Sequence, residues 1–93
     1  MFGQVPINLE KLSSEHINME ILRIALIAEL DAINLYEQMA AYTDDKHIKK
    51  VLLEVAKEEK EHVGEFQTLL LRLDKEQVEE MEEGRKEVEE LTE

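Results

Sequence analysis

The sequence has no cysteine and no tryptophan, and its 93 residues include only one proline, three glycines and 4% aromatic residues. Without cysteine the chain has no thiol nucleophile and cannot form cysteine-bound zinc sites or iron–sulfur clusters. A chain this short, without disulfides, lies near the lower limit at which a monomer buries enough apolar surface. We therefore expect it to self-associate.

Basic residues are also scarce, because 11 lysines and arginines stand against 23 acidic residues, a formal net charge of −12. Such a surface repels phosphate backbones and anionic lipids and attracts cations, so we expect no nucleic-acid partner and no membrane surface. No stretch approaches the roughly 20 apolar residues of a membrane span. Residues 1–12 lack a basic region followed by an apolar core, so we read no signal peptide and expect a cytoplasmic protein.

Residues 1–73 divide into an arm and a helical hairpin. Residues 1–13 contain Pro6 and no helical repeat, so we expect an extended arm. Residues 14–73 then form two Gly-poor and Pro-free runs, the first from about Glu15 to Tyr42 and the second from Lys46 to about Arg72. Ser13 and Ser14 suit the N-cap of the first helix, and the polar break over 43–45 can end it and cap the next.

Residues 74–93 predict a short, acidic C-terminal helix or tail. Asp74 can cap it, and it contains 10 acidic residues against 3 basic ones. Its apolar stripe is thin and is interrupted by Gly84. The predicted fold class is therefore all-α, an antiparallel helical hairpin plus a short C-terminal helix.

Each helix of the hairpin carries a seam, a row of mainly apolar residues at alternating steps of three and four. The first seam consists of Leu22, Leu26, Glu29, Ile33, Tyr36 and Ala40. The second consists of Ile48, Leu52, Val55, Glu59, His62, Phe66, Leu69 and Leu73. Acids are plentiful in the chain, yet only two of them lie in these seams.

In an antiparallel hairpin that turns near Asp44, residues at equal height have numbers that sum to about 88. Glu29 is then opposite Glu59, and His62 lies about 4.5 Å further along the axis. We therefore expect two carboxylates and an imidazole to meet in a dry interior. Two unpartnered carboxylates there cost several kcal/mol or more, and a divalent cation removes that cost. The alternatives are a protonated carboxyl group or an ion pair with Lys57 or Lys60, which lie off the seam.

The ligand set indicates the assembly. Dinuclear iron or manganese sites in helical bundles use one Glu from each of two helices and a Glu-x-x-His from each of the other two. This chain holds half of that set, Glu29 and the Glu59…His62 pair. Two copies about a two-fold axis would complete it and form a ferritin-like four-helix bundle. The expected content is two iron ions per dimer, and manganese could take the same ligands.

Two segments, Ile27–Gln38 and Glu58–His62, make the sequence resemble the encapsulated ferritins over about residues 14–90. The resemblance implies a ferroxidase that oxidises Fe(II) with O₂ at a di-iron centre across the dimer interface, with ligands at Glu29, Glu59 and His62. It further implies a ring-shaped decamer built of dimers. That ring would work inside an encapsulin nanocompartment, whose shell protein encloses the mineralised iron.

The resemblance also implies two accessory residues. Tyr36 matches a tyrosine beside the family's centre, which it would reach only across the dimer. Asp31 matches a carboxylate that attracts incoming iron, but a second such position is Ala28 here and the neighbouring tryptophan is Leu35. The sequence therefore matches only part of the family's entry route for iron and does not define the route in this chain.

Other readings of the sequence stay open. The ligand set also suits a rubrerythrin-like peroxidase or a manganese catalase, and a non-catalytic helical dimerisation module is the alternative without chemistry. The family's shell-targeting tail is not found after Leu91. This predicts either a domain of a longer shell fusion or a role other than cargo loading. His16 and His47 lie outside the seams and are assigned no role.

Overall fold

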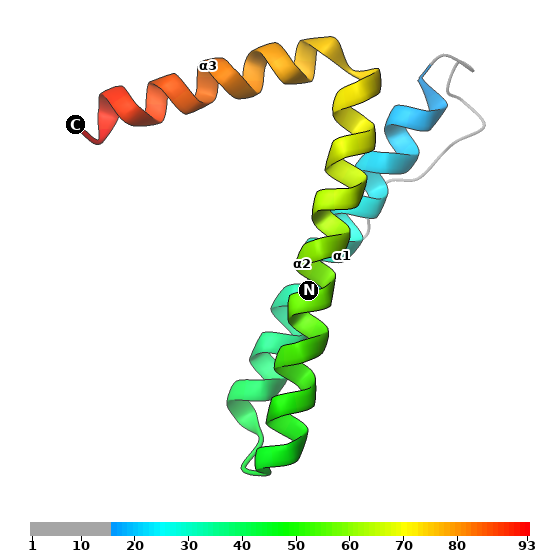
Figure 1. The fold of residues 1–93 in the computed structure, drawn as a ribbon, viewed down its shortest axis with the longest axis vertical. Helices are drawn as coiled ribbons and strands as arrows, with labels where there is room; N and C mark the ends of the chain where they lie inside the picture. The colour runs from blue at the N-terminus through cyan, green and yellow to red at the C-terminus, as the bar shows by residue number, and fades with distance from the viewer. Residues whose placement is uncertain (1–15) are drawn as a thin grey trace.

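The computed structural model describes residues 16–93, so the expected arm over 1–13 and the Ser13 and Ser14 caps lie outside the described residues. Three helices follow one another, α1 (Ile17–Tyr42), α2 (Lys46–Leu73) and α3 (Lys75–Leu91), and residues 16–93 contain no strand. α1 and α2 lie side by side as an antiparallel hairpin, and α3 turns away from its end (Figure 1). The predicted all-α class is confirmed.

The hairpin turn follows from local capping chemistry. One carboxylate oxygen of Asp45 accepts the backbone N–H groups of His47 at 2.8 Å and Ile48 at 2.9 Å. These bonds satisfy donors that have no partner inside the helix, so α2 starts at Lys46 as predicted. α1 begins at Ile17, two residues later than expected, and His16 at its N-cap makes no side-chain capping bond.

A single residue, Asp74, separates α2 from α3. Its side chain accepts the backbone N–H of Gln77 at 3.0 Å and so caps α3, as the sequence predicts. α3 then continues through Gly84 without a break to Leu91. The glycine that interrupts its apolar stripe does not interrupt the helix.

The hairpin has almost no core of its own. Among residues 16–93 the buried hydrophobic residues are Ala40, Ala56 and Leu70, because two helices alone cannot enclose a row of large side chains. The ends of the second seam are the least covered, with Ile48 53% and Leu73 46% exposed. The dry interior expected from the sequence is therefore absent from the described part of the chain.

Large apolar side chains are exposed on all three helices. They are Ile21, Leu30, Met39, Tyr42, Ile48, Val51, Leu53, Leu69, Leu73, Val78, Met81, Val88 and Leu91. In the described part of the chain, no helix combines the length and the apolar character needed to cross a membrane. Exposed apolar area on this scale is typical of surfaces that another protein covers.

Candidate metal centre

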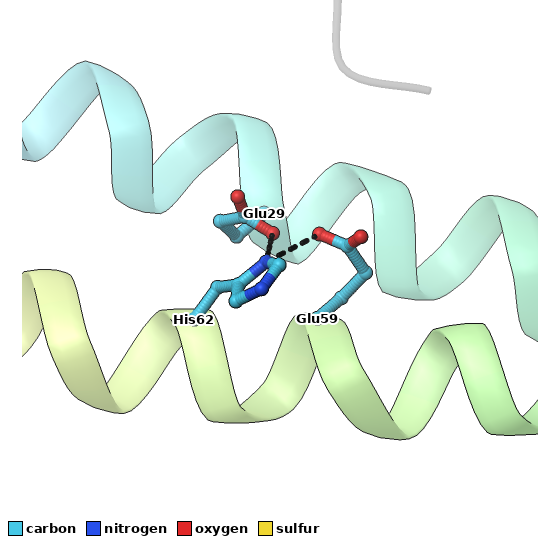
Figure 2. Close-up of side chains that lie close together, drawn as sticks. All are labelled: Glu29, Glu59 and His62. Atoms are coloured by element: carbon cyan, nitrogen blue, oxygen red, sulfur yellow. Dashed lines mark hydrogen bonds and ion pairs between the residues drawn. The ribbon is translucent and has the colours of Figure 1, made fainter.

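Three side chains of the seams meet midway along the hairpin and form the cluster Glu29, Glu59 and His62. Glu29 comes from α1, while Glu59 and His62 lie one turn apart on α2 and point toward it (Figure 2). His62 Nδ1 lies 3.4 Å from Glu29 Oε2 and 3.4 Å from Glu59 Oε2. One ligand atom from each residue can be chosen so that all three lie within 4.8 Å of one another.

These separations fit a transition-metal ion closely. With bonds of about 2.1 Å, as zinc makes to nitrogen and oxygen, two ligand atoms 3.4 Å apart subtend an angle of about 108° at the ion. Two ligands of one ion can be at most about 4.2 Å apart, so ligand atoms that lie within 4.8 Å of one another need to approach by about 0.6 Å at most. A small rotation of a Glu side chain supplies that movement. The ligand types, two carboxylates and an imidazole, suit iron and manganese.

The cluster is only partly shielded from water. The Glu29 and Glu59 side chains are 18% exposed, but the His62 side chain is 44% exposed. An ion held there by one chain would keep open coordination positions toward the surface. A second copy that covered this side would both shield the ion and bring further ligands.

Lysine does not neutralise the cluster. The Lys60 ammonium pairs instead with Glu37 on α1, at 3.1 Å. Among residues 16–93, His62 is the basic side chain that lies within ion-pair distance of Glu29 and Glu59. Two carboxylates thus share one imidazole, an arrangement that favours a cation between them.

The accessory residues lie outside the cluster. Tyr36 is half-buried on α1 and lies seven residues, about 10 Å, from Glu29 along the helix. Asp31 is half-buried and only two residues from Glu29, which places it on another side of α1. Within the described range, the cluster is the one group of three or more histidine, aspartate or glutamate side chains with metal-binding spacing.

The sequence alone gives no indication of the long-range contact between Arg23 and Asp74. Arg23 on α1 donates to Asp74 Oδ2 at 2.8 Å, across 51 residues of sequence. Neither residue belongs to a seam, so the spacing that identified the cluster gives no signal for this pair.

Several known proteins resemble this chain in sequence. The sequence pattern of the EncFtn-like family matches residues 4–85. A ferritin-like–encapsulin shell fusion protein of Pyrococcus furiosus is 62% identical over 86 residues, which cover 92% of this chain and 25% of that protein. The encapsulin nanocompartment cargo protein EncC of Myxococcus xanthus is 46% identical over 56 residues, 60% of this chain and 43% of that protein. The chain thus spans less than half of the length of each relative.

A solved structure resembles the whole chain. The crystal structure of the encapsulated ferritin domain from Pyrococcus furiosus superposes with a TM-score of 0.85 at 58% sequence identity. The match covers 99% of this chain and 94% of that domain. On the sequence pattern, the identity and the fold together, the chain belongs to the EncFtn-like family of encapsulated ferritins.

Proposed function

We propose that this protein is a ferroxidase, which oxidises its substrate Fe(II) to Fe(III) with O₂ at a centre formed by two copies of the chain. The observation that carries the proposal is the cluster, in which Glu29, Glu59 and His62 bring three ligand atoms within 4.8 Å of one another. Glu29, Glu59 and His62 of both chains would hold two ferrous ions per dimer.

Dimerisation is supported by the incomplete ligand set and the small core of a single chain. It supplies one lone glutamate and one Glu-x-x-His, half of the ligand set of a dinuclear site in a helical bundle. The 44% exposure of His62 and the near absence of a core leave the same hairpin in need of a partner. Two copies about a two-fold axis satisfy both requirements as a four-helix bundle.

The proposed chemistry assigns each residue a task. Each Fe(II) gives one electron, so the two ferrous ions of one centre together reduce O₂ to H₂O₂ with two protons. Reduction of one O₂ to two waters takes four electrons and four protons, and so consumes four Fe(II), two fillings of the centre. Carboxylates of Glu29 and Glu59 favour the harder Fe(III) product, while the imidazole of His62 also holds Fe(II). Tyr36 would act from the second copy as a neighbour of the centre, and Asp31 would attract incoming iron.

The names of the relatives support a place for this activity. One relative is a fusion to an encapsulin shell and the other is an encapsulin cargo protein. We extend the proposal to a chain that assembles into a decameric ring of dimers and works in the cytoplasm within an encapsulin nanocompartment. The shell protein is then its partner.

A second candidate function uses the same site. Carboxylate and imidazole ligands also suit manganese, so the cluster fits a manganese catalase or a rubrerythrin-like peroxidase. The exposed apolar residues, taken alone, fit a non-catalytic dimerisation module.

Parallel turnover measurements separate these functions. We expect the protein to consume O₂ when Fe(II) is added and to turn over H₂O₂ far more slowly with either metal. Glu59→Gln should abolish the O₂ reaction, whereas Glu54→Gln, the same change at an exposed position of α2, should leave it intact. Faster turnover of H₂O₂ than of Fe(II) would support the second candidate, and no turnover of either substrate would support the dimerisation module.

A further inference from the structure

The corner between α2 and α3 is held by one side chain with three connections. Asp74 is the only residue between Leu73 and Lys75, so it ends α2 and starts α3. One carboxylate oxygen accepts the N–H of Gln77 in α3, and the other accepts from the Arg23 guanidinium of α1. All three helices therefore meet at this carboxylate, whose side chain is only 13% exposed.

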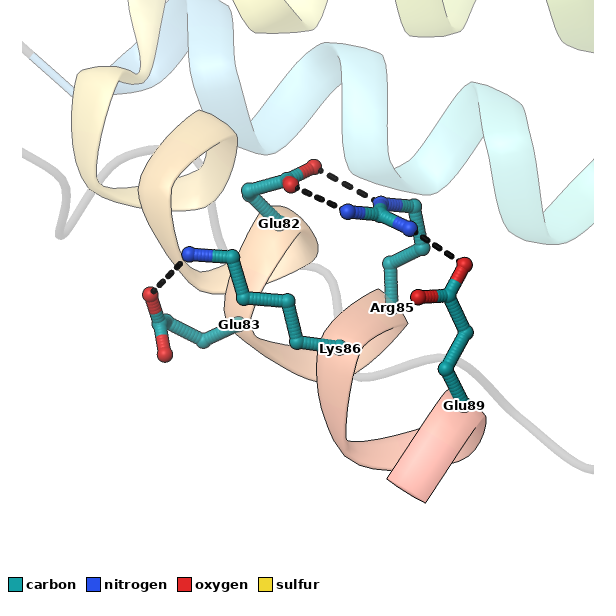
Figure 3. Close-up of polar contacts among 5 residues, drawn as sticks. All are labelled: Glu82, Glu83, Arg85, Lys86 and Glu89. Carbon is teal, nitrogen blue, oxygen red and sulfur yellow. Dashed lines mark hydrogen bonds and ion pairs between the residues drawn. The ribbon is translucent and has the colours of Figure 1, made fainter. Parts of the chain in front are cut away.

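Beyond this corner, α3 has little that fixes its direction. None of its residues is buried, and its ion pairs stay within the helix. Arg85 pairs with Glu82 and Glu89, and Lys86 pairs with Glu83 (Figure 3). These contacts stiffen α3 along its own axis, but they do not orient it relative to the hairpin.

Because α3 is long, a small change of angle at the corner displaces its far end by a large distance. Its 17 residues extend about 25 Å at 1.5 Å per residue, so a rotation of about 20° at Asp74 moves the far end by about 9 Å. The apolar residues Val78, Met81, Val88 and Leu91 move with it. Any surface that α3 presents to a second molecule depends on the angle at which the helix leaves the hairpin.

A surface ion pair alone is a weak restraint, because two long side chains must be held in one geometry. The Asp74 carboxylate differs from the carboxylate of an isolated surface pair, because its capping bond to Gln77 fixes its orientation independently of Arg23. Arg23 is itself oriented by Glu20, at 3.8 Å one turn earlier on α1. The pair therefore loses less conformational freedom on forming than an isolated pair at the surface.

An apolar pocket of about 440 Å³ lies at the same corner. Leu26 and Ile27 of α1, Leu70 and Leu71 of α2 and Met81 of α3 line it. Arg23 and Gln77, which both bond to Asp74, also border it. The shape of this pocket thus depends on the same contact that fixes α3.

We propose that Arg23 and Asp74 form a latch that sets the direction of α3 relative to the hairpin. The polar contact by which Arg23 acts on α3 is its bond to Asp74, so Arg23 is a positioning residue with no part in the proposed chemistry. The pKa of Asp74 is lowered, in agreement with this geometry. The N–H of Gln77 is the largest cause, desolvation opposes it, and the hydrogen bond and charge of Arg23 and the charge of His16 lower the pKa further.

Spin-label distances test the latch directly, because the chain has no native cysteine. Lys50→Cys on α2 and Glu90→Cys on α3 are both exposed positions and would carry the labels. Labelled chain is diluted with unlabelled chain, so that each assembly holds at most one labelled copy. The parent should give one narrow distance distribution.

Removal of either half of the latch should broaden that distribution by about 5 Å or more, given the length of α3. The variants are Arg23→Gln and Asp74→Asn, the second of which keeps a side chain that can cap α3. Combining them should add little, since each alone opens the same contact. Arg85→Gln is the matched control, because it removes an arginine whose partners all lie within α3.

Two results overturn the proposal. One is a distribution in Asp74→Asn as narrow as in the parent, which also decides the matter if Arg23→Gln does not fold. The other is equal broadening in Arg85→Gln.

Discussion

Neutralising one carboxylate of the cluster should make the metal-free protein more stable than the parent. With metal bound, the same variant should be no more stable than the parent. The change is Glu59→Gln, which keeps the size of the side chain and removes its charge. In the metal-free protein, two carboxylates whose ligand oxygens lie within 4.8 Å of each other repel by about 3 kcal/mol at an effective dielectric constant of 20. Because both side chains are 18% exposed, we expect a gain of about 1–3 kcal/mol on substitution.

A bound cation reverses this order. At 1,000 times its dissociation constant, a divalent ion stabilises the parent by about 4.1 kcal/mol. The variant has lost one of the three ligands and should gain less than about 1 kcal/mol under the same conditions. The parent is then as stable as the variant or more stable, although it was the less stable of the two without metal.

Urea unfolding measures both halves of this prediction. Parent and variant are unfolded anaerobically at one fixed protein concentration, with and without Mn²⁺. Glu54→Gln is the control, because the same substitution at an exposed position of α2 should shift neither curve. If Mn²⁺ stabilised Glu59→Gln as much as the parent, the cluster would not be the binding site and the reasoning would be refuted.

Three further predictions concern single residues. Tyr36→Phe should keep about one iron per chain and slow oxidation in stopped-flow absorbance, because the hydroxyl group is not a proposed ligand. Asp31→Asn should slow iron uptake without changing the affinity at equilibrium, which a titration at low salt can compare with kinetics. The N–H of Gln77 and, to a lesser extent, Arg23 lower the pKa of Asp74 in the folded protein. The charged Asp74 therefore contributes its full stabilisation above the ordinary pKa of aspartate. This stabilisation is lost as the pH falls through the lowered pKa of the folded protein. Asp74→Asn should therefore lose less stability than the parent on acidification from about pH 5 to pH 2, followed by circular dichroism.

Local chemistry made the helix boundaries predictable. Asp45 and Asp74 cap the second and third helices as their positions in the sequence indicate, because a carboxylate beside free N–H groups acts over two or three residues. Helical spacing also brought Glu29, Glu59 and His62 to one level of the hairpin. These predictions need only the geometry of one helix or of two that run antiparallel.

The surroundings of the cluster were not predictable in the same way. Seam spacing shows which residues share a face, but it does not show whether one chain covers that face, and His62 proved to be 44% exposed. The contact between Arg23 and Asp74 joins two residues 51 positions apart, so the spacing of residues within one helix gives no signal for it. Both depend on packing between segments far apart in the sequence.

An anaerobic Fe(II) titration followed by sedimentation tests most directly whether two chains build one centre. At protein concentrations where the metal-free chain is partly monomeric, we predict saturation at about one iron per chain and a shift of mass toward dimers or larger assemblies as iron binds. Ligands contributed by two chains couple the two events. A monomer that stays monomeric while it binds iron just as tightly would contradict the account.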